Sequence, residues 1–247
     1  SVSETALGAE IVTDRTEKFL EEAENGVYIS SACPVVVEYI RKYSPDHARF
    51  ITPIISPMLA HAKILKQLYG EDVKIVFAGP CICKKLEADY FNNLVDVVIT
   101  FKDLKKWFEQ SDINLKNIAP NQPEARFVPY RSGMGAYYPI EGGMLKGMQE
   151  GKKQIHHMAF SELSTVKDVL KELDSHREND SIFLELLACK GGCINGPAKL
   201  SHISPALKRY EIIHQSELGN PKDDFKNIDL QILFCKDPHV QDHTYTE

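Results

Sequence analysis

Continuous apolar runs alternate with amphipathic segments along this chain, and this alternation restricts its fold more than any other feature. Three runs have the length and character of strands that are buried on both faces; they cover residues 73–79, 95–101 and 182–189. Segments with helical periodicity lie before, between and after them. The pattern predicts an α/β fold with parallel-rich sheets flanked by helices.

Prolines, small polar residues and glycines mark the ends of the expected helices. Pro34 and Pro57 stand where a first helical residue is expected, Thr13 is a plausible N-cap, and Gly26 and Gly70 are stop signals. The expected helices cover residues 13–26, 34–44, 56–70, 102–111 and 164–179. The Pro-rich, polar stretch 117–133 indicates a long connection that divides two lobes, approximately 1–120 and 121–247.

Composition narrows the class of protein. The 247 residues, 43% of them hydrophobic and 26% charged, suit one large domain or two small ones with a real core. A net charge of -6 disfavours a nucleic-acid partner. The sequence has neither an apolar run long enough for a membrane helix nor a signal peptide, so we expect no membrane partner and a cytoplasmic location. The missing initiator Met suggests a fragment of a longer chain.

The cysteines are the candidate functional residues. In a chain of this size without an export signal, metal binding or catalysis is the better interpretation than disulfides. Four of the six lie at or just after predicted strand ends, where ligands of α/β sheets bind; they are Cys33, Cys81, Cys189 and Cys193. Four thiolates can bind a 4Fe–4S cluster or a structural zinc, and their wide spacing favours the cluster. Cys83 and Cys235 lack this setting and are interpreted as ordinary buried thiols.

Three segments resemble, in order, the motifs of the catalytic domain of iron-only hydrogenases, which holds the H-cluster. Residues 30–34 (SSACP) are similar to the family's T-S-C-C-P, and residues 80–87 (PCICKKLE) to its P-C-x-x-K-K-x-E. Residues 185–196 (ELLACKGGCING) are similar to its E-x-M-A-C-x-G-G-C-x-x-G. Weaker likeness extends from residue 1 to about residue 200. The family's domain begins with a further strand and helix, which again suggests a fragment.

The resemblance implies a metal site in the cleft between the two lobes. Cys33, Cys81, Cys189 and Cys193 would ligate a 4Fe–4S cubane, and Cys193 would also bridge to a two-iron subsite that carries carbon monoxide and cyanide. Lys84 would donate to a cyanide of that subsite. By the same likeness, Ser56 and Pro57 would belong to the lining of the cofactor site.

Departures from the family pattern affect proton delivery. The family's proton-donating cysteine is Ala32 here, and a methyl group cannot carry a proton. Glu17 and Asp14 fall where the family's outer relay carboxylates lie, although with Ala32 present the interpretation as a pair of exposed helix carboxylates is slightly favoured. Around the expected subsite the family's Met, Met and Gln are replaced by Gly79, Leu187 and Met58. Such changes alter a metal's potential and access without removing its ligands.

Intact ligands and a broken relay resemble the sensory-type members of the family. We therefore expect a hydrogen or redox sensor with slow H2 turnover, which exchanges H2 and protons and signals to an electron-transfer or PAS-type module. One alternative is a non-enzymatic 4Fe–4S protein of the same fold, as in hydrogenase-like iron–sulfur assembly factors. A zinc-stabilised or cysteine-rich interaction domain is a third interpretation.

Overall fold

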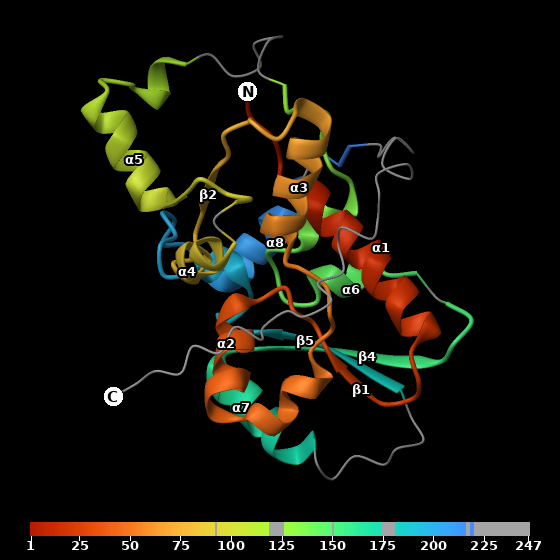
Figure 1. Cartoon of the computed structure of the whole chain (residues 1–247). Coiled ribbons are helices and arrows are strands. Elements are labelled where there is room, and N and C mark those ends of the chain that lie inside the picture. Colours follow the sequence, from red (N-terminus) through yellow and green to blue (C-terminus); the bar gives the residue numbers. More distant parts are fainter. Residues whose placement is uncertain (92, 119–125, 150, 174–180, 216–217, 220–247) are drawn as a thin grey trace, which may run out of the picture.

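Two parallel sheets organise the chain in the computed structural model, which describes residues 1–91, 93–118, 126–149, 151–173, 181–215 and 218–219 (Figure 1). The larger sheet has the strand order β1-β5-β4 and the smaller one pairs β2 with β3. The strands are β1 (Val27–Ile29), β2 (Val76–Gly79), β3 (Val97–Thr100), β4 (Ile155–Ser161) and β5 (Ser181–Leu187). Every pairing is parallel, which confirms the predicted α/β class.

The helices are named in chain order. They are α1 (Ala6–Glu22), α2 (Pro34–Tyr43), α3 (Pro57–Tyr69), α4 (Cys83–Tyr90), α5 (Phe101–Gln110), α6 (Gly143–Gly147), α7 (Leu163–Glu172) and α8 (Pro205–Gln215). Short 3-10 turns cover Pro45–Phe50, Leu115–Asn117, Met134–Tyr137 and Cys193–Asn195. None of these described helices has the length and apolar character needed to cross a membrane.

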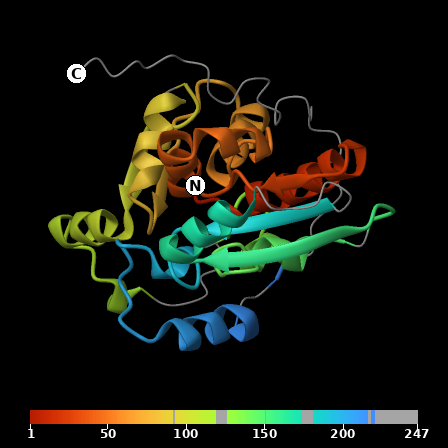
Figure 2. The ribbon, with the colours of Figure 1, turned by 90° about the horizontal axis from the view of Figure 1, so that it is seen from below.

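The central strand β5 separates two layers of helices. On one face its Leu184 and Leu186 pack with residues of α2 and α7, whereas on the other face Phe183 packs with residues of α1, α3 and α6. Figure 1 shows α2 and α7 below the sheet and α1 and α6 above it, and Figure 2 gives the view from below. The sheet takes β1 from one side of the predicted boundary at residue 120 and β4 and β5 from the other; the two-lobe division stays a prediction.

The first helix begins earlier than the sequence predicted. Thr13, expected as an N-cap, lies inside α1 and is buried. Its Oγ1 donates to the carbonyl of Ala9, one turn earlier in the same helix, and this bond satisfies the hydroxyl group. The helix ends at Glu22 and not at Gly26. The proline predictions are confirmed, because Pro34 and Pro57 are the first residues of α2 and α3. The predicted stop at Gly70 is also confirmed, since Gly70 follows α3 with a φ of 96°.

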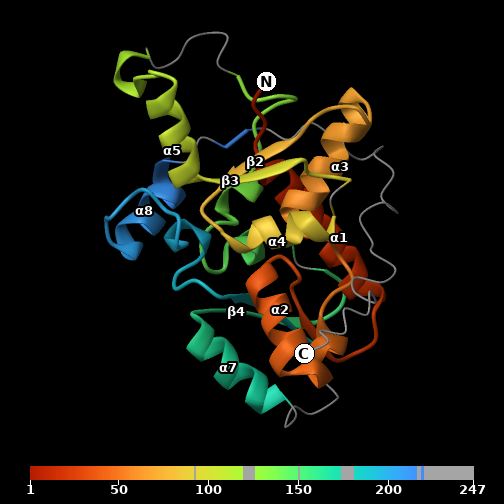
Figure 3. The same cartoon turned by 60° about the vertical axis from the view of Figure 1, so that its left-hand side comes forward.

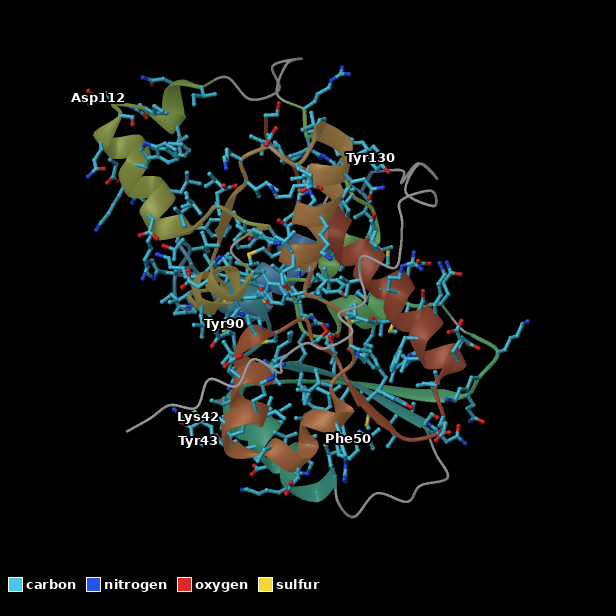
Figure 4. All side chains as sticks on the ribbon, in the orientation of Figure 1. Lys42, Tyr43, Phe50, Tyr90, Asp112 and Tyr130 are labelled. Atoms are coloured by element: carbon cyan, nitrogen blue, oxygen red, sulfur yellow. The ribbon has the colours of Figure 1, made fainter. Side chains whose placement is uncertain are left out.

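The smaller sheet corrects a second prediction. Its strands were expected to be buried on both faces. Their first residues, Val76 of β2 and Val97 of β3, are however exposed. β2 pairs only with β3 in the part of the chain that the structure describes, and α4 and α5 flank the pair (Figure 3). Thr100 caps α5 through a reciprocal capping box with Asp103. α5 extends away from the rest of the molecule to Asp112 at its far end (Figure 4).

Three further expectations had different outcomes. β4 was missed because its residues 156–158 are polar or exposed at the sheet edge, so no continuous apolar run marks it. α7 begins at Leu163, one residue before the expected caps, and the rest of the predicted helix 164–179 runs into residues 174–180, outside the described chain. Cys235 and the C-terminal tail also lie outside the described residues.

Helices α1 and α3 approach closely at Gly8 and His61. A Cβ atom on Gly8 would lie 2.7 Å from the Cβ of His61 and would come closer still to the carbonyl oxygen of Pro57. His61 is 6% exposed, and its Nε2 pairs with the hydroxyl of Ser3 at 2.8 Å. Burial lowers the pKa of His61 to about 4. The helix pair therefore holds a neutral imidazole in its interface.

We expect acid to destabilise the fold through His61. Its folded pKa lies below the unfolded value near 6.5, so the unfolded state takes up the proton first. Stability is full above pH 6.5 and falls by about 3 kcal/mol as the pH drops to 4. Chemical denaturation at pH 7 and pH 4.5 measures this loss, and H61Q should reduce it. An unchanged pH dependence in H61Q would contradict the assignment.

Candidate metal centre

Each of three strands delivers a cysteine at its carboxyl end. Cys33 follows β1 and precedes Pro34, the first residue of α2; Cys81 lies two residues beyond β2, and Cys189 two residues beyond β5. Because β1 and β5 are parallel and paired, Cys33 and Cys189 leave the sheet at the same edge. The predicted strand-end positions are thus those the chain adopts.

Burial and other predicted ligand cysteines raise the pKa of Cys33, Cys189 and Cys193. Burial raises the pKa of Cys193, and the charges of Cys33, Cys81 and Cys189 raise it further. Burial also raises the pKa of Cys189 to about 11, again with Cys33 and Cys81 contributing. For Cys33, burial raises the pKa, and backbone N–H groups of residues 188 and 36 oppose the rise. The five described cysteines are free thiols.

The spacing of these donors bears on which metal they suit. Among the described residues, no three His, Cys, Asp or Glu side chains lie close enough to bind a single ion. A tetrahedral zinc requires four donors around one point, whereas each thiolate of a cubane binds a different iron. The choice of a cluster over zinc therefore stays with the wide spacing of the four cysteines in the sequence. The assignment of the four cysteines as ligands remains a prediction.

The turn between Cys189 and Cys193 is built from close backbone contacts. Gly191 and Gly192 have φ values of 73° and 104°, which L side chains rarely adopt. A Cβ on Gly192 would lie 2.8 Å from the Cα of Ile140 and would come closer still to the carbonyl oxygen of Pro139. On the other side, the N–H of Gly191 donates to Ser161 Oγ at 2.8 Å. Both glycines thus let the loop pass between neighbouring segments. This passage determines the position of Cys193, which directly follows Gly192.

Lys84 lies in a buried polar triad that the sequence only partly indicated. Its Nζ donates to Ser56 Oγ at 2.8 Å and to Glu87 Oε2 at 2.7 Å, and Ser56 Oγ donates to the same carboxylate oxygen at 3.0 Å. The side chains of Lys84 and Glu87 are 11% and 12% exposed. The Lys84 charge also lowers the pKa of Cys33 and Cys193. The ammonium group is therefore held in place by Ser56 and Glu87.

Ala32 sits in a short polar network beside Cys33. Its N–H donates to Ser30 Oγ at 3.3 Å, and Ser30 Oγ in turn contacts Met144 Sδ at 3.4 Å. Ser31 Oγ donates to the carbonyl of Ile54. The hydroxyl groups of Ser30 and Ser31, the two residues before Ala32, are thus both hydrogen-bonded.

The two predicted lining residues lie together at one helix start. Pro57 begins α3 directly after Ser56, and Ser56 belongs to the triad with Lys84. The structure therefore brings Ser56 to the predicted cyanide partner. Whether either residue contacts a cofactor stays a prediction.

The two predicted relay carboxylates differ in environment. Asp14 is exposed, and it pairs with Lys18 at 2.8 Å and with Arg15 at 3.7 Å. Glu17 is partly buried, and its Oε1 accepts from the N–H of Gln149. Burial raises the pKa of Glu17, while the Gln149 N–H lowers it. Asp14 thus has the exposed position considered from the sequence, but Glu17 does not.

Cys83, interpreted from the sequence as an ordinary buried thiol, is only partly buried. It is the first residue of α4, and burial together with the charges of Cys81 and Cys33 raises its pKa to about 11. It lines a hollow between α2, α3 and α4, which Glu87 and Tyr90 also line (Tyr90 is labelled in Figure 4). Cys83 is therefore near the thiol group without being at a strand end.

Sequence reasoning missed Glu185 as a separate feature. It lies on the central strand β5, where it is 2% exposed. A single acid inside the apolar run IFLELLAC was a signal that could have identified it, because an unpaired acid is rarely fully buried.

Comparison with protein families gives one match over most of the chain. The family described as "Iron only hydrogenase large subunit, C-terminal domain" matches residues 1–197. Iron hydrogenase 1 from Clostridium pasteurianum is 24% identical over 276 residues, which cover 93% of this chain and 46% of the relative. The cytosolic Fe-S cluster assembly factor narfl from Danio rerio is 26% identical over 264 residues, which cover 82% and 62%.

The chain spans about half the length of the curated relatives it matches. Among solved structures, FeFe-hydrogenase HydA1 from Chlamydomonas reinhardtii superposes with a TM-score of 0.64 at 18% identity. The match covers 94% of this chain and 78% of that chain. At this identity the likeness concerns the fold, and it agrees with the parallel sheets and flanking helices described above.

Replacing Gly192 by Ala tests the close approach in the cysteine turn. We expect G192A to displace Cys193 and to lower the iron content after cluster reconstitution, because the new Cβ meets backbone atoms that cannot move away. G70A is the matched control, since Gly70 also has a positive φ but no atom within 4 Å of an added Cβ. Equal iron content in the two variants would show that the approach at Gly192 is unimportant.

Replacing Lys84 by Met tests the buried triad. Removal of one partner leaves the Glu87 carboxylate buried without its cation, so K84M should lower the free energy of unfolding by about 3–5 kcal/mol. The neighbouring Lys85 forms an exposed pair with Asp103 at 3.1 Å, and K85M should cost about 1 kcal/mol or less. Urea denaturation of the cluster-free chain measures both. Similar costs for the two variants would argue against a buried, paired Lys84.

Proposed function

Because the chain belongs to the family of C-terminal domains of iron-only hydrogenase large subunits, we propose that it is a hydrogenase-like iron–sulfur domain that senses hydrogen or redox state and turns H2 over slowly. A 4Fe–4S cluster is held by Cys33, Cys81, Cys189 and Cys193. The observation that carries the proposal is that the parallel strands β1 and β5 deliver Cys33 and Cys189 to the same edge of one sheet, while Cys81 follows β2. Burial and neighbouring cysteines raise the pKa of Cys33, Cys189 and Cys193, and a cationic iron core would offset this cost of ionising them.

The residues also fit a two-iron subsite next to Cys193. Two of the three N–H donors of Lys84 are used by Ser56 and Glu87 in the described contacts, so one remains for an anionic ligand such as cyanide. Glu87 and Ser56 fix the ammonium in position, and burial of the triad excludes water. When bound, a two-iron group supplies the centre at which protons and electrons combine to H2.

Ala32 supports a sensor more than a fast enzyme. A general acid at this position would contribute about 10²–10⁴-fold to the rate, and a methyl group contributes nothing. The four thiols and Lys84 can still hold and respond to the cofactor. A protein of this kind reports the state of its cluster to an electron-transfer or signalling module, which we place on the same or another chain.

A non-enzymatic 4Fe–4S protein is the second candidate, and a specific finding favours it. Relatives named as cytosolic Fe-S cluster assembly factors are as similar in sequence as the hydrogenase relative: 26% identity against 24%. On this alternative the chain holds a cubane but no two-iron subsite. The names of these relatives also support a cytosolic location for this chain.

Infrared spectroscopy after maturation distinguishes the two candidates. We expect carbon monoxide and cyanide bands once the reconstituted chain is supplied with a two-iron precursor. Rebuilt cubane without these bands would leave the assembly-factor alternative as the better account.

Restoring a thiol at position 32 tests the sensor proposal. A32C should raise H2 turnover by about 10²–10⁴-fold, because it returns a proton donor to the site. A32S is the control of similar size, and its hydroxyl is too weak an acid to take this role. If A32C is no faster than the parent while the infrared bands are intact, the missing thiol does not limit turnover.

A further inference from the structure

Helix α8 lies at the outer edge of the molecule (blue in Figures 2 and 3), and no residue of α8 belongs to either apolar core of the described chain. Lys208 is its one buried residue among the side chains that the structure describes. The family match ends at residue 197, so the family likeness does not account for this helix. Two neighbouring cations, Lys208 and Arg209, join α8 to the cysteine turn, which is defined here as residues 189–196.

Lys208 donates from its ammonium group to three oxygens at the end of the cysteine turn and just beyond it. Its Nζ lies 3.0 Å from the carbonyl oxygen of Ser201 and 3.4 Å from both the carbonyl oxygen of Ile194 and Asn195 Oδ1. An ammonium group has three N–H donors, so these contacts use all of them. Lys208 is 6% exposed, and a buried ammonium group is costly to separate from its acceptors. It therefore holds the two residues that follow Cys193.

Asn195 extends this contact across the turn. Its Nδ2 donates to the carbonyl of Lys190 at 3.0 Å, while its Oδ1 accepts from the Lys208 ammonium. Lys190 directly follows Cys189, whereas Asn195 lies two residues after Cys193. One amide side chain thus links the ammonium group of Lys208 to both ends of the turn.

Arg209 supports the middle of the turn through Glu141. Its Nη1 donates to the carbonyl of Glu141 at 2.7 Å, and the N–H of Glu141 donates to the carbonyl of Gly191 at 3.3 Å. The N–H of Gly191 donates to Ser161 Oγ at 2.8 Å, and this hydroxyl group donates to the Glu141 carboxylate. Both backbone polar groups of Gly191 are therefore bonded to residues that Arg209 helps to hold.

A hollow of about 380 Å³ lies between the start of α8 and the cysteine turn. Pro205, Ala206 and Arg209 line it from α8, and Lys190 and Gly191 line it from the turn. Hydrogen bonds, and not close packing, therefore join helix and turn at this place. An element with few buried apolar contacts opens at a lower free energy than the core does. The attachment of α8 can thus come loose while the core stays folded.

We propose that Lys208 and Arg209 clamp the cysteine turn from α8 and control how long the turn retains an iron–sulfur cluster. The inference rests on the proposed function, because it takes Cys189 and Cys193 as cluster ligands. Lys208 and Arg209 are positioning residues and not ligands. With the clamp closed, the two thiols are held in place before iron binds, so little of the chain has to be ordered on binding. With the clamp open, the turn adopts other shapes and the thiolates release iron more readily.

Loss of iron to an excess of chelator measures how long the cluster is retained. The reconstituted K208M and R209M variants should lose iron about tenfold faster than the parent under anaerobic conditions, because each lacks charge-assisted hydrogen bonds that hold the turn. K190M is the matched control, since Lys190 directly follows Cys189 but its Nζ forms an exposed pair with Glu162 at 3.0 Å. K190M should lose iron at the parent rate. Parent-like loss in both K208M and R209M would overturn the proposal.

Amide hydrogen exchange of the cluster-free chain tests the clamp without any metal. The N–H groups of the turn that donate to backbone carbonyls belong to Gly192, Ile194, Asn195 and Gly196. K208M should speed exchange at these amides by about tenfold, because the turn opens more often. R209M should act instead on the N–H groups of Gly191 and Glu141. Amides of β5 are the internal control and should exchange as in the parent.

The exchange pattern separates a clamp from general support of the fold. Unchanged exchange in the turn of both variants would show that α8 does not hold it, whatever the chain binds. An equal rise in β5 would mean that Lys208 and Arg209 stabilise the whole fold, and the clamp would again be wrong. If the parent binds no iron and sulfide while exchange changes as expected, the result counts against the proposed function and not against the clamp.

Discussion

The parallel pairing of β1 with β5 places Cys33 and Cys189 at one edge of a single sheet, and the rest of the candidate site depends on that geometry. An antiparallel pairing would send the two cysteines to opposite ends. Cys193 follows through a turn that needs glycine at Gly191 and Gly192, and Cys81 arrives from the second sheet. The proposed metal centre therefore takes its cysteines from both sheets, and no single segment supplies them all.

Burial of charge-bearing groups is the second requirement of this site. Cys33 and the side chains of Lys84 and Glu87 are largely buried, where unpaired charges are costly. Ser56 stabilises the Lys84–Glu87 pair, whereas burial and other cysteines raise the pKa of Cys33 and Cys193. On the proposed function, bound iron would offset the cost of ionising these thiols.

The sequence predicted those helix ends and strands that depend on interactions between residues close together in the chain. Pro34 and Pro57 begin helices, Gly70 follows one, and the apolar run before Cys189 is a central strand, because each depends on a few neighbouring residues. The prediction of Thr13 as an N-cap was wrong. A threonine inside a helix can donate to the carbonyl one turn earlier, and the sequence alone does not distinguish it from a capping threonine. β4 was missed because an edge strand needs no apolar pattern on its outer side. The triad around Lys84 joins residues 28 positions apart, a contact that no spacing rule reveals.

The central claim is that four particular cysteines hold an iron–sulfur cluster. Iron and acid-labile sulfide analysis of the anaerobically reconstituted chain tests it most directly, with single Cys→Ser variants at positions 33, 81, 189 and 193 and with C83S as the matched control. The account predicts about four irons and four sulfides in the parent and in C83S, and a marked loss in each of the other variants. One zinc without sulfide in the parent, or a loss in C83S equal to that in the others, would contradict it.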